Sequence, residues 1–159
     1  MRTAYLAADG FAPQLTEELR RGGVRVTAAH DRLLIAEGDA IASAWAANTW
    51  HDVQEVAIAS IGEAAQRLRA VQRNWAMYAP VHHRRAALIQ ARLPHVSAKP
   101  LVFPSALPAA PLGSWTLLAP DRLLHAARCS VPCPNGEISF AEDRSGPPSR
   151  AYLKLWEAF

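Results

Sequence analysis

The chain has 159 residues, half of them apolar, which is enough for a folded core and excludes an intrinsically disordered protein. No segment approaches the roughly 20 consecutive apolar residues of a membrane-spanning helix, and the first residues lack the layout of a signal peptide, so we expect a cytoplasmic protein. The net charge of +3 is modest and excludes little until it is mapped along the chain.

The charge distribution is uneven. Residues 1–63 carry nine acids and five bases, residues 64–120 carry seven bases and no acid, and residues 121–159 carry five of each. The seven bases of the middle segment are Arg67, Arg69, Arg73, Arg84, Arg85, Arg92 and Lys99. Because this segment contains no carboxylate, its positive field must face water, acids from elsewhere or a polyanion.

The first third predicts the order β-α-β-β-α-β, which is typical of a ferredoxin-like domain over residues 1–59. Apolar runs, alternation and glycine or proline boundaries define each element. The elements are a strand at 3–8, a helix from Pro13 to Arg21, strands at 24–28 and 33–36, a short helix from Gly38 to about Ala47 and a strand at 53–59.

The second third predicts helix, strand, helix, strand, strand over residues 60–130. Ser60 and Glu63 form a capping-box pattern at the start of the first helix. The elements are helices at 60–72 and 82–93 and strands at 74–78, 114–118 and 122–128. Five prolines between Pro94 and Pro111 predict a loop or edge segment. The whole chain is therefore expected to have an α+β fold.

A turn-rich linker is predicted over residues 131–148, with one small strand at 137–140, and a final helix begins near Ser149. Four of the five tryptophans lie before residue 120, and each has a predicted role. Trp45, Trp50 and Trp115 are predicted as core anchors, and Trp75 is predicted to be buried rather than to stack on a nucleobase.

The last helix contains Ser149-Arg150-Ala151-Tyr152-Leu153-Lys154-Leu155. This segment resembles the Ser-Arg-x-x-x-Lys-Leu motif with which FtsJ-type RNA 2′-O-ribose methyltransferases lead into their S-adenosylmethionine domain. The following Glu157-Ala158-Phe159 is similar to the branch that methylates large-subunit (23S) ribosomal RNA. The order of elements at 60–130 is likewise similar to part of a THUMP-like RNA-binding domain, which that branch carries between a ferredoxin-like domain and its catalytic domain.

The resemblance implies an enzyme in which residues 149–159 are the helix that leads into the methyltransferase domain. Lys154 matches the first catalytic Lys, which would help the ribose 2′-hydroxyl lose its proton. Arg150 would hold RNA near the cofactor, and Ser149 would cap the helix. The other catalytic residues of the family would follow Phe159, so the chain alone is expected to be inactive and to bind no cofactor.

The basic segment predicts an RNA surface that presents substrate to the catalytic domain. We expect its contacts at Arg67, Arg69, Arg73, Arg84, Arg85 and Arg92, with Arg150 at the junction. The alternative for these positions is an ordinary solvated helix face.

Two other classes of function remain open from the residues. One is a ferredoxin-like regulatory or protein-interaction module without nucleic acid, which would scatter the arginines or pair them with acids from residues 1–63. The other is a small enzyme that uses Cys129, Cys133 and His125 in one pocket. The two cysteines are expected to be reduced thiols, and no metal site is expected because neither belongs to a CxxC pair.

Overall fold

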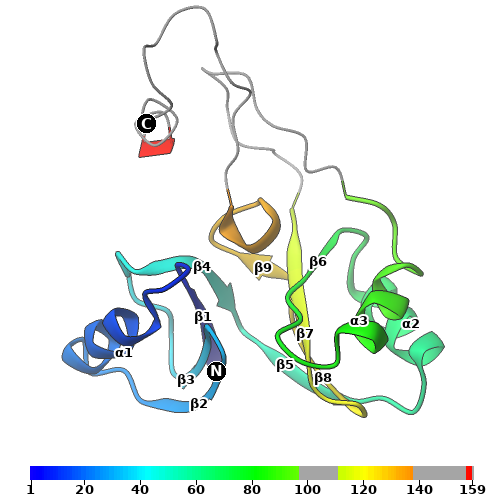
Figure 1. Ribbon diagram of the computed structural model, residues 1–159, viewed down its shortest axis with the longest axis horizontal. Coiled ribbons are helices and arrows are strands. Elements are labelled where there is room, and N and C mark those ends of the chain that lie inside the picture. Colours follow the sequence, from blue (N-terminus) through cyan, green and yellow to red (C-terminus); the bar gives the residue numbers. More distant parts are fainter. Residues whose placement is uncertain (97–110, 138–156, 159) are drawn as a thin grey trace, which may run out of the picture.

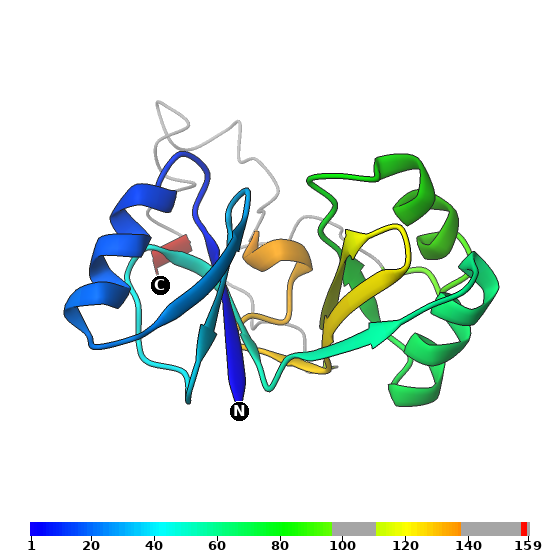
Figure 2. The same cartoon turned by 90° about the horizontal axis from the view of Figure 1, so that it is seen from below.

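The computed structural model describes residues 1–96, 111–137 and 157–158. It has an α+β fold, as the sequence predicts, in which two sheets lie between helices (Figures 1 and 2). The described elements, in chain order, are β1 (Arg2–Ala7), α1 (Ala12–Arg21), β2 (Val26–His30), β3 (Leu33–Glu37), β4 (Ala46–His51), β5 (Gln54–Ala57), α2 (Ile61–Val71), β6 (Trp75–Met77), α3 (His83–Gln90), β7 (Gly113–Ala119), β8 (Arg122–Ala126), β9 (Arg128–Cys129) and a 3-10 turn, η1 (Pro134–Gly136).

The first sheet has the strand order β2-β3-β1-β4-β9, and α1 covers its outer face (Figure 2). Successive side chains of a strand point to opposite faces. In β1, Tyr5 and Ala7 therefore pack towards α1, while Ala4 and Leu6 pack towards the second sheet. Burial on both faces explains why β1 and β3 are apolar along almost their whole length.

The second sheet has the order β5-β8-β7-β6, and α2 and α3 cover its outer face (Figures 1 and 2). The core under these helices contains Trp75, Trp115 and Leu123 from the sheet, with Leu68 and Ile89 from the helices. The inner faces of the two sheets share a further core. The molecule is thus built in four layers: α1, the first sheet, the second sheet, and the α2–α3 pair.

One antiparallel ribbon runs through both sheets. β4 pairs with β9 through Trp50 opposite Cys129, and β5 pairs with β8 through Gln54 opposite His125, so the register is the same on both sides of the bend. Asp52, at the bend, has a left-handed backbone with a φ of 50°. This ribbon continues the chain from one sheet into the other without a separate linker.

A second connection joins the two sheets through Tyr78, which follows β6. Its hydroxyl donates to a carboxylate oxygen of Asp31 at 3.2 Å and accepts from the backbone N–H of Arg32 at 3.0 Å. The pKa of Tyr78 is raised, mainly by burial, so the phenol stays protonated and its O–H remains available to donate to Asp31.

The helix predicted from Gly38 to Ala47 is wrong, and the specific ferredoxin-like arrangement is not confirmed. Residues 39–45 form an extended loop, and β4 begins at Ala46. The Glu18 carboxylate on α1 accepts hydrogen bonds from the backbone N–H groups of Ala44 and Trp45 at 2.7 and 3.2 Å. These contacts, and the pairing of β4 with β1, supply partners that a helix would otherwise provide.

The other predicted elements that fall within the described residues agree in type, within a few residues at each end, whereas β9 and η1 were not predicted as elements. The strand predicted at 53–59 forms as β5, but it pairs with β8 in the second sheet and not within the first sheet. Most of the proline-rich segment, the small strand predicted at 137–140 and the final helix from Ser149 fall largely outside the described residues.

Candidate nucleic-acid interface

The α2–α3 pair forms the outer layer over the second sheet. At the start of α2, the Ser60 hydroxyl accepts from the Glu63 N–H at 3.0 Å, and the Glu63 carboxylate accepts from the Ala59 N–H at 2.9 Å. The first bond satisfies a backbone donor that the first helical turn leaves free, and the second ties the residue before the cap to the helix. The predicted capping pair is therefore confirmed, and it sets where α2 begins.

The arginines of this layer lie outside its apolar face. Ala64, Ala65 and Leu68 of α2 and Ala86 and Ile89 of α3 are buried against the sheet. The remaining helical positions face outward because 3.6 residues make one turn. Arg67, Arg69, Arg73, Arg84 and Arg92 are exposed, and Arg85 is half-buried. We call this outer face of residues 60–92 the arginine surface.

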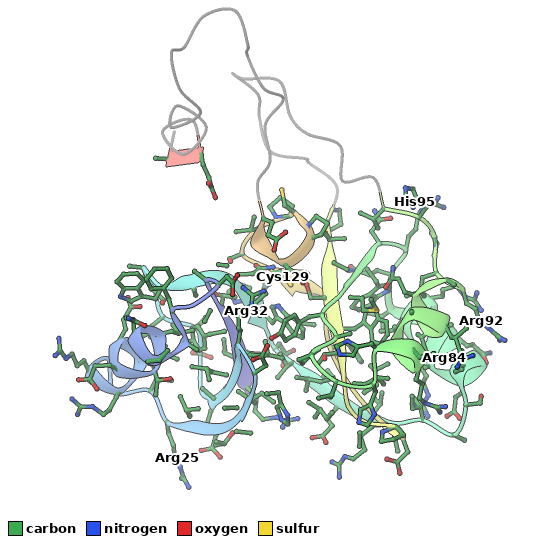
Figure 3. All side chains as sticks on the ribbon, viewed as in Figure 1. Arg25, Arg32, Arg84, Arg92, His95 and Cys129 are labelled. Atoms are coloured by element: carbon green, nitrogen blue, oxygen red, sulfur yellow. The ribbon has the colours of Figure 1, made fainter. Side chains whose placement is uncertain are left out.

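Arginines of α2 and of the end of α3 come together across the helix pair. The Arg69 guanidinium donates to the backbone carbonyl of Arg92 at 3.0 Å. The Arg92 side chain also lies close to the first turn of α2. If Gly62 carried a Cβ, that atom would be 3.1 Å from Nη1 of Arg92. Figure 3 shows Arg84 and Arg92 on the same side of the molecule, at the α2–α3 layer.

The acids near this surface neutralise little of its charge. Arg67 pairs with Glu63 one helical turn away, at 3.6 Å, and both side chains are partly exposed. Arg85 donates to the backbone carbonyl of Pro120 at 2.7 Å. Within the described residues, the side chains of Arg73, Arg84 and Arg92 have no hydrogen bond or ion pair. The surface therefore keeps an excess of positive charge and free donors.

The Trp and Tyr side chains next to the arginine surface are buried and not available for stacking. Trp75 is fully buried, as predicted, and its indole N–H donates to the Leu68 and Gln72 carbonyls at 2.9 and 3.0 Å. Tyr78 is only 6% exposed and is held between the sheets. The exposed rings of this layer belong to His82 and His83, at the start of α3.

Three of the predicted site residues cannot be placed on this surface. Arg150 and Lys154, with the capping residue Ser149, lie outside the described residues, and so does the seventh base of the acid-free segment, Lys99. The described geometry therefore bears on the proposed RNA-binding arginines of residues 67–92 and not on the catalytic motif.

A groove of about 520 Å³ lies beside the end of α3, between that helix, β6 and η1. Its lining is mainly apolar and includes Met77, Leu93 and Pro134, with His95 at the following loop (Figure 3). Gln90 also lines the groove, and two hydrogen bonds fix its side chain. The amide N–H donates to the Trp75 backbone carbonyl, and the amide oxygen accepts from the Trp115 indole N–H. No sequence pattern indicated this groove, which depends on the turn at Pro134 reaching β6.

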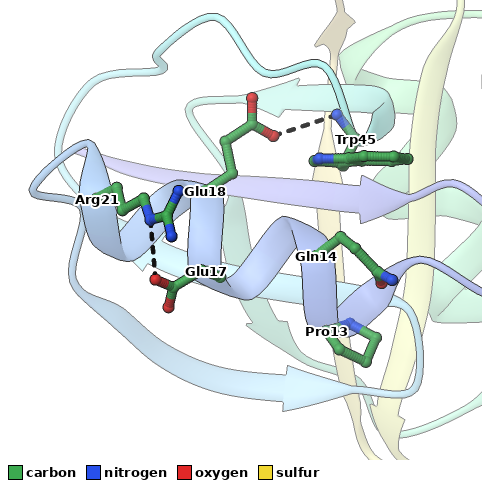
Figure 4. Close-up of a pocket in the computed structure, with 6 residues that line it drawn as sticks. All are labelled: Pro13, Gln14, Glu17, Glu18, Arg21 and Trp45. Carbon is green, nitrogen blue, oxygen red and sulfur yellow. Dashed lines mark hydrogen bonds and ion pairs between the residues drawn. The ribbon is translucent and has the colours of Figure 1, made fainter.

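A second groove, of about 490 Å³, lies along α1 (Figure 4). Trp45 forms one side of it and stacks on Phe11 with ring centroids 4.9 Å apart. Trp45 is 39% exposed, so its predicted role as a core anchor is wrong, whereas Trp50 and Trp115 are fully buried as predicted. The Glu18 hydrogen bonds that replace the predicted helix also hold Trp45 at the surface.

The surroundings of Cys129, Cys133 and His125 disfavour nucleophilic chemistry. Burial is the main cause that raises the pKa of the Cys129 thiol to about 11, and burial also raises the pKa of Cys133. Both cysteines are free thiols. His125 packs edge-on against Trp75 with centroids 5.7 Å apart, and burial lowers its pKa. These environments disfavour the thiolate that a nucleophile requires.

Cys129 is therefore expected to resist alkylation in the folded protein. At pH 8 a thiol of pKa about 11 is roughly 0.1% thiolate, against about a quarter for an ordinary cysteine, so iodoacetamide should modify Cys129 at least about a hundredfold more slowly than after unfolding in urea. Mass spectrometry of the peptides separates Cys129 from Cys133. Modification at the same rate in the folded and unfolded protein would contradict this burial.

Among the described residues, no group of three or more His, Cys, Asp or Glu side chains is placed to hold a metal ion. In the same part of the chain, every helix is too short or too polar to cross a bilayer.

Comparison with known proteins adds no assignment: no family model, no curated protein and no solved structure matches the chain significantly.

Proposed function

We propose that this chain is the RNA-binding portion of a cytoplasmic, S-adenosylmethionine-dependent 2′-O-ribose methyltransferase that acts on large-subunit ribosomal RNA. The observation that carries the proposal is the arginine surface, where six arginines face a single acid, Glu63, across residues 60–96. Guanidinium groups in this density favour a polyanion, because each can bind a phosphate with two parallel hydrogen bonds.

The link to methyl transfer rests on the Ser149–Leu155 motif and not on the described geometry. We assign S-adenosylmethionine, the methyl donor, to the catalytic domain into which this motif leads. Lys154 would orient the ribose 2′-hydroxyl or accept its proton, and Arg150 would hold the adjoining phosphate. The arginine surface would deliver the RNA to that junction, so the chain alone is expected to bind RNA and to methylate nothing.

The proposal predicts salt-dependent binding of RNA. If about four phosphates are contacted, the slope of log K against log salt concentration should be about −3 for single-stranded RNA and somewhat steeper for a duplex, because each neutralised phosphate releases most of one counterion. Fluorescence anisotropy of a labelled, structured rRNA fragment at several salt concentrations measures this slope. Absence of binding, or binding that salt does not change, would remove the proposal.

A second candidate is a protein-interaction module, and the exposed Phe11–Trp45 stack on the α1 groove favours it. Exposed aromatic pairs of this kind are common at protein interfaces. This groove lies beside Glu17 and Glu18, in the acid-rich part of the chain, and is formed by other elements than the arginine surface. The same titration separates the two candidates, because a protein-interaction module has no reason to bind RNA.

A further inference from the structure

We infer that the arginine surface binds double-stranded RNA, through backbone phosphates and helix shape rather than through unstacked bases. This inference rests on the proposed function, because it specifies the RNA that the same surface takes. Proteins that recognise single-stranded RNA splay the bases out and stack them on aromatic rings, whereas duplex recognition uses phosphate and 2′-hydroxyl contacts across an extended face.

The first argument is the absence of a stacking platform of Trp, Tyr or Phe in the described part of this face. Trp75 and Tyr78 are buried and hydrogen-bonded inside the molecule. Apart from the imidazoles of His82 and His83 at the start of α3, the exposed residues between the arginines are small or aliphatic, namely Ala70, Val71, Val81, Ala87, Leu88 and Ala91. A face of this kind can approach a phosphate backbone closely, but beyond the adjacent His82 and His83 it offers successive bases no ring to stack on.

The second argument is the spread of the guanidinium groups. Arg84 lies in the first turn of α3 and Arg92 just beyond its end, and eight residues of helix correspond to about 12 Å. Arg67, Arg69 and Arg73 lie on the neighbouring α2 and its C-terminal end. Several phosphates must therefore be engaged at once, over two helices, which suits the regular backbone of a duplex.

The third argument is that part of the surface is held in place before RNA binds. Arg69 and Arg85 each use one donor on a backbone carbonyl, at 3.0 and 2.7 Å, and keep other N–H donors free. Such fixed side chains lose less conformational freedom on binding than free ones. Arg73, Arg84 and Arg92, which have no described partner, add donors that need not break a bond to reach a phosphate.

The test compares three labelled probes by fluorescence anisotropy with the full chain: an RNA hairpin stem of about 20 base pairs, an unstructured RNA of equal length and a DNA duplex of the stem's sequence. We expect the stem to bind at least about tenfold more tightly than either of the others. A second stem of unrelated sequence should bind within about twofold of the first.

Single-variant measurements complete the test. Arg84→Gln should weaken binding of both stems equally and reduce the salt slope by about one. Arg25→Gln removes an exposed arginine at the edge of the first sheet and should leave both affinities unchanged.

Equal or tighter binding of the unstructured RNA would overturn the duplex inference and point to His82, His83 and the groove at Met77. Equal binding of the DNA duplex would overturn recognition of RNA shape. Binding of none of the RNAs would instead remove the proposed function itself.

Discussion

Replacement of Arg73, Arg84 and Arg92 together by glutamine is expected to lower the affinity for RNA about a hundredfold at 0.1 M salt. Each guanidinium that contacts a phosphate contributes roughly 0.7 to 0.9 to the salt slope, so three contacts correspond to two or more orders of magnitude between 1 M and 0.1 M salt. These three side chains have no described partner within the protein, so their loss should not disturb the fold.

The matched control removes three exposed arginines from the opposite side of the molecule. Arg20 and Arg21 lie on α1 and pair with Glu17, and Arg25 pairs with Glu37. The variant Arg20→Gln/Arg21→Gln/Arg25→Gln changes the net charge by the same amount, so any effect of overall charge appears in both variants. Equal losses of affinity would mean that RNA responds to net charge alone and that the arginine surface is not the binding site.

Replacement of Trp75 by alanine is expected to reduce the free energy of unfolding by about 3 to 5 kcal/mol, the usual range for removing a buried aromatic side chain. Trp75 is fully buried in the core beneath α2 and α3 and packs edge-on against His125. Its indole N–H also satisfies carbonyls at the end of α2, at Leu68 and Gln72. Truncation therefore leaves both a cavity and unpaired acceptors.

The control for this loss is Trp45→Ala, because Trp45 is 39% exposed and contacts Phe11 at the surface. Its replacement should cost about 1 kcal/mol or less. Urea unfolding followed by far-UV circular dichroism measures both variants without relying on tryptophan fluorescence. Similar losses at the two positions would show that Trp75 does not anchor the helix layer.

Local sequence patterns were sufficient to predict most strands of the second sheet and the two helices that cover it. α2, β6, α3, β7 and β8 form where apolar spacing, the Ser60–Glu63 pair and the turn residues predict them. The burial of Trp75 and Trp115 was also predictable, because large rings within apolar segments have few other places to go. The arginines of the candidate site could be named because an acid-free segment is visible in the order of residues alone.

The region of residues 38–57 was decided only by the tertiary structure. Its alanines favour a helix by propensity, but β4 pairs with β1 and β9, and Glu18 binds the loop before it. The partners of these contacts lie tens of residues away, so no local window contains them. The same contacts hold Trp45 at the surface and lead β5 into the second sheet.

The order of residues by itself determined an α+β protein with a strongly basic middle segment, and the methyltransferase entry motif at residues 149–155 stays a prediction from that order. The tertiary structure decided which arginines of the α2–α3 layer are exposed, and which of them donate to backbone carbonyls. The physical reason is that charge sign and local periodicity are properties of single residues and short windows. The packing of α2 against α3, and the burial of the rings beneath them, depend on contacts between residues distant in the chain.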